Sequence, residues 1–225
     1  MRTILLRRVV GVLGGALCLM VPTAAPAPGE TLEARVAAAV RGTWVHGVTD
    51  AIAEREVGEA GVPVLVRLLA DPAFDRRDNV VAFLAHLGGP DATRALVGFL
   101  ESPPAPLTIP EEERALLLAP QALGQIARRR DPAAADLLLE MTEDGSNGAV
   151  LTKAAARASD PAAMRDDLLQ MALRGLGYSG DPRARARLEA VAAGRVRPVA
   201  DGRDLRPAAT VALEILDDLE AEPRR

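Results

Sequence analysis

Apolar positions along this chain follow a helical period, and a short phrase recurs between the helical patterns. The phrase is a Leu-Gly pair, a polar stretch, and an Asp that precedes Pro or Ala. It stands at Leu87-Gly88, at Leu123-Gly124 and at Leu176-Gly177. Because an apolar helical pattern lies on either side of each phrase, the sequence predicts a repeated helical hairpin. The first helix of each hairpin is expected to end at the Leu-Gly pair.

The apolar stripe of each first helix is found by reading back three, four and seven residues from its last leucine. From Leu87 these positions hold Leu84, Phe83 and Val80, and the same reading from Leu176 and Leu216 also gives apolar residues. This spacing places the side chains on one face of a helix. The second unit keeps the pattern but contains Pro120, so we expect a kink or a broken turn there.

The second helices are expected to begin at Asp-Pro pairs. Asp offers a side-chain acceptor at the N-cap, and Pro has the φ angle of the first helical residue. Four such pairs occur, namely Asp71-Pro72, Asp131-Pro132, Asp160-Pro161 and Asp181-Pro182. An earlier and more degenerate unit is predicted from a helix within residues 48–57 and the apolar segment 61–69.

Two insertions interrupt the repeat. The number of residues between the last leucines of successive first helices is largest in the middle interval. A turn cluster at 143–148 and a short extra helix over 149–158 are predicted there. A proline-rich segment, 102–110, is expected to be an extended loop, and Thr108 with Glu111 fits a capping box. Insertions in repeat proteins often carry the binding function. An insertion without any function fits the sequence equally well.

The segment Leu205–Leu216 resembles the first helix of a HEAT unit almost residue for residue. From Val62 to about Leu219 the chain resembles the HEAT and armadillo-like superfamily, in particular the short HEAT-like units of phycobilin lyases. The resemblance implies an all-α fold, a right-handed α-solenoid of HEAT-like helical hairpins with about four to five repeats. It specifies architecture much better than function.

Residues 1–27 are predicted to be a signal peptide, followed by a HEAT-like α-solenoid domain over 28–225. Arginines precede a short apolar run, 9–21, and a stretch of small residues and prolines follows it. An uncleaved signal anchor is the alternative. A lipid anchor at Cys18 fits poorly because Leu17 stands directly before it. We therefore expect a bacterial periplasmic or extracellular protein with no stable membrane span after signal cleavage.

Composition restricts the core and the partners. Hydrophobic residues make up 49% of the chain but aromatic residues only 2%, so we expect a core of closely approaching helices. The formal net charge is −4, which argues against nucleic acid as a partner. The only cysteine is Cys18, in the predicted signal peptide, so no disulfide is expected in the domain.

Groups suited to catalysis are scarce. The two histidines are His46 and His86, and no His or Cys pair has metal-ligand spacing. His86 is expected near a helix C-terminus, where the helix dipole favours a cation. The oxygen-rich segment 144–148 lacks the carboxylate pattern of a calcium loop. We predict no catalytic residues, no metal and no cofactor, and therefore a protein that is not an enzyme.

Candidate binding residues are few. Trp44 and His46 are the best candidates for a pocket, although Trp44 also fits as a cap on the core of the first unit. Arg183 and Arg187 share a helix face, and the resemblance to HEAT proteins would place them on a concave surface, where they would contact an acidic partner. Tyr178, in the preceding turn, is included in this predicted partner-binding surface.

The basic turn at 128–130 supplies Arg129 as a further partner-binding candidate, with a solvated turn as the alternative. The last helix carries two apolar stripes, Val211 with Ile215 and Leu213 with Leu216, that fit a homo-oligomer. The sequence thus predicts an exported, non-enzymatic HEAT-repeat scaffold that binds a protein or peptide partner in the cell envelope. The alternative is a small-ligand-binding or lyase-like HEAT protein with Trp44, His46 and Tyr178 near its pocket.

Overall fold

The computed structural model describes residues 31–103, 110–143, 149–198 and 202–221. These ranges hold α-helices and one short 3-10 helix, and no strand. The all-α prediction is therefore confirmed. The predicted signal peptide, the capping box at Thr108 and the turn at 144–148 lie wholly or partly outside the described residues. No helix in the described ranges has the length and apolar character needed to cross a membrane.

The α-helices vary in length from 7 residues in α2 and α8 to 20 in α6. Their bounds are α1 (Leu32–Arg41), α2 (Asp50–Glu56), η1 (Glu59–Gly61), α3 (Val62–Ala70), α4 (Arg77–Leu87), α5 (Pro90–Glu101), α6 (Pro110–Arg129), α7 (Ala133–Met141), α8 (Ala149–Ala155), α9 (Pro161–Ser179), α10 (Pro182–Ala192) and α11 (Arg206–Ala221). The extra helix predicted after the middle insertion is α8.

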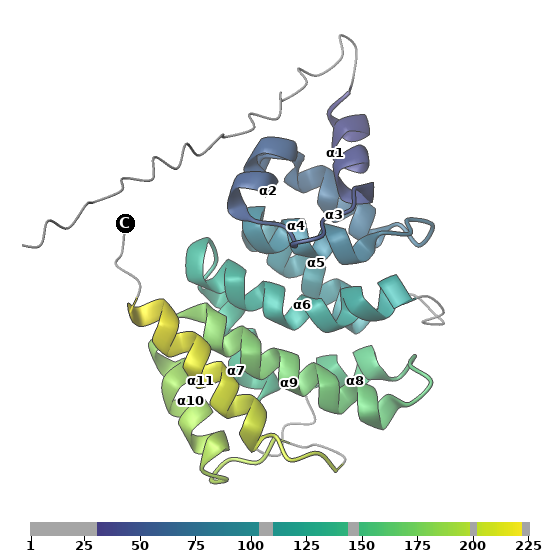
Figure 1. Ribbon diagram of the computed structural model, residues 1–225. Helices are drawn as coiled ribbons and strands as arrows, with labels where there is room; N and C mark the ends of the chain where they lie inside the picture. The colour runs from purple at the N-terminus through teal and green to yellow at the C-terminus, as the bar shows by residue number, and fades with distance from the viewer. Residues whose placement is uncertain (1–30, 104–109, 144–148, 199–201, 222–225) are drawn as a thin grey trace, which may run out of the picture. The chain divides into compact units, whose positions relative to one another are not determined.

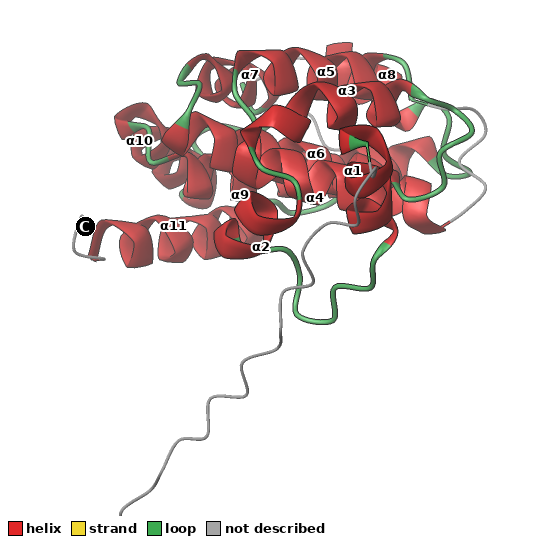
Figure 2. Ribbon diagram, turned by 90° about the horizontal axis from the view of Figure 1, so that it is seen from above, coloured by secondary structure: helices red, strands yellow, loops and turns green. Residues whose placement is uncertain are grey.

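Four helices, α4, α6, α9 and α11, pack one after another and make the most extensive contacts within Thr31–Arg225. Four other helices pack onto this row: α5 and α7 onto α6, α8 onto α9, and α10 onto α9 and α11. Figure 1 shows the four helices of the row following one another from α4 to α11. Figure 2, turned by 90°, shows α3, α5, α7 and α8 along the opposite side from α11.

The Asp-Pro pairs begin helices in three of four cases. Asp160 caps α9 by accepting a hydrogen bond from Ala163 N at 3.1 Å, and Asp181 caps α10 in a similar way. Asp131 accepts from Ala133 N at 3.2 Å, at the start of α7. Asp71 is the exception, because it ends α3 and forms a turn by accepting from Ala73 N at 2.9 Å.

The Leu-Gly pairs end a helix only once. α4 ends at Leu87, as predicted, but α6 continues past Gly124 to Arg129 and α9 continues past Gly177 to Ser179. The prediction that these helices end at Leu-Gly was wrong. Pro120 also lies inside α6, which is not broken there.

Two glycines of the phrase, Gly124 and Gly177, serve close helix packing instead of helix termination. A Cβ added to Gly124 would collide with the backbone of Gly175 in α9, and one added to Gly175 would come within 2.5 Å of the carbonyl oxygen of Pro120. A Cβ on Gly177 would come within 2.5 Å of Ala212 O in α11. α6 therefore meets α9, and α9 meets α11, nearly backbone to backbone, which a glycine at each contact permits.

The predicted apolar stripes form the core. Val80, Phe83 and Leu84 of α4 are fully buried, and the corresponding stripe of α9 is buried as well. In α11, Ala209 and Ala212 are buried but Leu213 is only partly buried, and Val211 is 38% exposed. The core thus consists mainly of small and aliphatic side chains, which is consistent with close helix packing.

Candidate functional site at the start of α4

A run of polar residues begins α4, and most of it is buried. Arg77 is only 2% exposed, Asp78 7% and Asn79 9%. Charged groups are rarely buried to this extent unless they are paired, because desolvation is costly. This cluster is therefore the most unusual polar feature among the described residues, and its contacts decide what it can do.

Arg77 holds three elements together. Its Nη1 donates to Asp71 O, at the end of α3, at 3.0 Å, and its Nη2 forms an ion pair with Glu112 in the first turn of α6. The Glu112 side chain is itself only 12% exposed. The Nε of Arg77 is buried and has no hydrogen-bond partner within the described part of the chain. The guanidinium charge is thus compensated, whereas one of its donors is not used.

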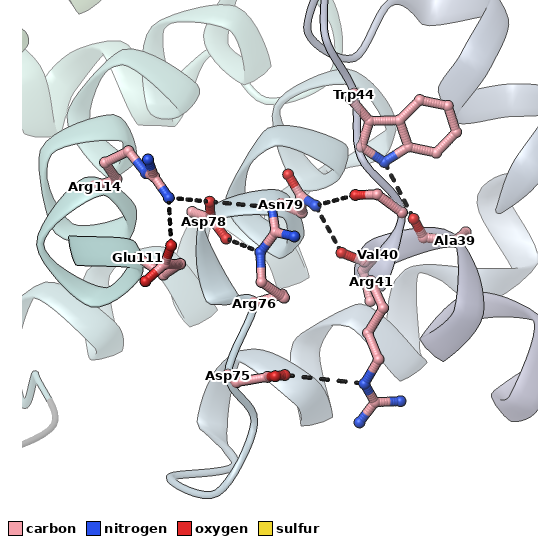
Figure 3. Close-up of polar contacts among 11 residues, drawn as sticks. Ala39, Val40, Arg41, Trp44, Asp75, Arg76, Asp78, Asn79, Glu111 and Arg114 are labelled. Carbon is pink, nitrogen blue, oxygen red and sulfur yellow. Dashed lines mark hydrogen bonds and ion pairs between the residues drawn. The ribbon is translucent and has the colours of Figure 1, made fainter. Parts of the chain in front are cut away.

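Asp78 forms a second link between α4 and α6 (Figure 3). It accepts from Arg76 Nε at 3.0 Å and pairs with Arg114 at 3.4 Å. Arg114 also pairs with Glu111 at 2.8 Å. Alternating charges from two helices therefore neutralise one another, and the start of α4 is fixed against the start of α6.

Asn79 and Trp44 complete the C-terminus of α1 (Figure 3). Asn79 Nδ2 donates to Val40 O at 2.7 Å and to Gly42 O at 3.0 Å. Trp44 Nε1 donates to Ala39 O at 3.1 Å. The last carbonyl groups of a helix have no partner within the helix, so side chains that donate to them stabilise its end. These two side chains attach α1 to the rest of the domain.

An apolar groove lies beside the cluster, between α3 and α5. Its volume is about 460 Å³. We call it the α3–α5 groove, and it is lined by Val66, Leu69, Ala70, Pro72, Arg77, Ala95, Gly98, Phe99 and Ser102. A volume of this size fits a small ligand or a few side chains of a partner. Of the polar cluster, only Arg77 belongs to the lining of the groove.

Sequence analysis missed this site, although a signal was present. The apolar stripe of α4 contains Val80, Leu84 and Leu87, and the next position of that stripe toward the N-terminus is Arg77. A charged residue on a buried stripe indicates a buried ion pair. The groove itself left no such signal because its lining comes from two helices and a turn.

The predicted pocket residues Trp44 and His46 lie in the segment after α1. The Trp44 ring packs edge-to-face on Phe83, with the ring centres 5.7 Å apart. Its N–H donates a hydrogen bond to the carbonyl oxygen of Ala39. His46 is exposed in a turn. These contacts of Trp44 fit the alternative interpretation, in which it caps the core. The pocket remains a prediction.

The predicted partner-binding arginines on α10 contact neighbouring elements. Arg183 pairs with Asp136 of α7 at 2.7 Å and with Asp181 at 2.8 Å, and its guanidinium lowers the pKa of Asp181. Arg187 donates to Leu139 O at 3.1 Å and is partly buried. Arg183 keeps 58% of its side chain exposed, so it is the more accessible of the two. Tyr178 is partly buried near the end of α9.

Arg129 also has a partner within the chain. It forms an ion pair with Asp50 of α2, and Asp50 contacts His86 Nδ1 at 2.6 Å. The hydrogen bond from Arg129 is the main reason that the pKa of Asp50 lies below its usual value of 3.8. His86 is in the last turn of α4, as predicted. This trio joins α2 to the ends of α4 and α6.

The described residues contain no group of three or more His, Cys, Asp or Glu side chains placed to hold a metal ion. Comparisons with known proteins gave no further guidance. No family model, no curated protein and no solved structure matches the chain. The function is therefore argued from the residues and their arrangement alone.

Proposed function

We propose that this chain is an exported, non-enzymatic helical-repeat scaffold that binds a protein partner in the cell envelope. The main observation behind the proposal is the close contact of α6 with α9, which recurs between α9 and α11. Gly124 of α6 lies against Gly175 of α9, and Gly177 of α9 lies against Ala212 of α11. A unit that packs in the same way on its successor is the basis of a repeat array.

The finer architecture belongs to the same proposal. We place the chain among HEAT-like proteins, as a right-handed α-solenoid with about four to five repeats. The row of α4, α6, α9 and α11, with α5, α7, α8 and α10 packed onto it, supports this assignment. Repeat arrays present extended surfaces, and their functions are usually binding functions. That general behaviour, together with the scarcity of catalytic groups in the sequence, favours a scaffold over an enzyme.

Export rests on the sequence of residues 1–27, with arginines before a short apolar run and small residues after it. The only cysteine of the chain lies within this segment. A domain without cysteine is compatible with an oxidising compartment because it has no thiol to oxidise. N-terminal sequencing of the protein from the envelope fraction would test this part, with a new N-terminus near residue 28 as the expected result.

The partner surface is best tested at Arg183. The full chain with a C-terminal affinity tag is expressed in its native host, and proteins bound in the envelope fraction are identified by mass spectrometry. We expect a stoichiometric partner that Arg183→Glu captures less well. The matched control is Arg206→Glu, because Arg206 pairs with Asp204 two residues before it, just as Arg183 pairs with Asp181. Equal loss with both variants, or no specific partner, would contradict the proposal.

A small-ligand function is the alternative, and the sequence places it near Trp44 and His46. Trp44 is the only tryptophan, so its fluorescence reports on that region alone. A ligand bound there would change the fluorescence in a saturable way. Trp44 packs against Phe83 and donates a hydrogen bond to Ala39. This structural role of its side chain favours the scaffold over a ligand pocket.

A further inference from the structure

We draw no further inference here: the strongest candidate, the apolar α3–α5 groove beside the buried polar cluster, carries none because nothing in the structure shows what covers it.

Discussion

The contacts of α6 with α9 and with α4 differ in kind. Toward α9, α6 offers Gly124 and the carbonyl of Pro120, so two helices meet nearly backbone to backbone. Toward α4, the first turn of α6 offers Glu112, which pairs with the buried Arg77. The first contact excludes side chains and the second depends on them. One helix therefore shows two ways in which neighbouring helices of this domain hold together.

The two contacts should respond differently to substitution. A backbone contact between glycines has no room for an added side-chain atom, but a substitution there removes no charge. A buried ion pair tolerates changes of shape, but removal of one partner leaves the other charge without compensation. The groove lies beside the second kind of contact, since Arg77 belongs both to the ion pair and to the groove wall. The following variants test this difference and are ordered by the expected loss of stability.

Loss of the ion-pair partner should have the largest effect. Glu112→Gln leaves the charge of Arg77 buried without its counter-charge, so we expect unfolding free energy to fall by about 3–5 kcal/mol. Urea denaturation followed by Trp44 fluorescence measures the change. The double variant Arg77→Met, Glu112→Leu removes both charges and should lie within about 1 kcal/mol of the wild type. Equal destabilisation by the single and double variants would show that charge is not the cause.

An added methyl group in the backbone contact should come next. Gly124→Ala forces α6 and α9 apart because the new Cβ meets the backbone of Gly175, and we expect a loss of about 3 kcal/mol. Gly98→Ala is the matched control, since its Cβ meets open space. That control should stabilise the protein by about 0.5–1 kcal/mol through helix propensity. Similar effects at both positions, measured by urea denaturation, would remove the distinction between them.

The attachment of α1 should be weaker than either contact of α6. Asn79→Ala removes both hydrogen bonds to the end of α1, at Val40 and Gly42, and leaves a buried carbonyl without a donor. We expect a loss of about 1–3 kcal/mol. Hydrogen exchange should accelerate in α1 but not in α9. Uniform acceleration in both helices would show instead that Asn79 supports the whole domain.

The surface trio at the end of α6 should contribute least. The pKa of Asp50 is lowered, chiefly by Arg129, so its contribution to stability is complete above its unfolded pKa of 3.8 and is lost as pH falls through the lower folded value. Asp50 is more than half exposed, which limits the effect to about 0.5 kcal/mol. Denaturation of wild type and Asp50→Asn between pH 6 and about pH 3 measures it. The two curves should converge at low pH, and parallel curves would contradict the assignment.

Periodicity was sufficient to locate most helices. The stripe that ends at Leu87 predicted α4, and the Asp-Pro pairs at Asp160 and Asp181 mark the first residues of α9 and α10. These features are local, since capping and amphipathicity depend on residues within a few positions of one another. Asp71 was misassigned because the same Asx geometry that caps a helix also forms a turn.

The candidate site was less accessible to sequence reasoning. Arg77 lies on the buried stripe of α4, but its partner Glu112 is thirty-five residues away and belongs to another helix. The groove depends on which faces of α3 and α5 meet. Gly98 could be recognised as unusual only after the surroundings of every glycine were known. Pairings of this kind are long-range and leave no fixed spacing in the sequence.

The sequence alone determined that this protein is helical, where most helices begin, and which side chains form the core. Those properties follow from hydrogen bonds and hydrophobic periods within single segments. The role of the Leu-Gly phrase depended on long-range packing, because Gly124 and Gly177 are required by the backbone of a different helix. The same holds for Arg77, whose burial is possible only because Glu112 is brought to it by packing.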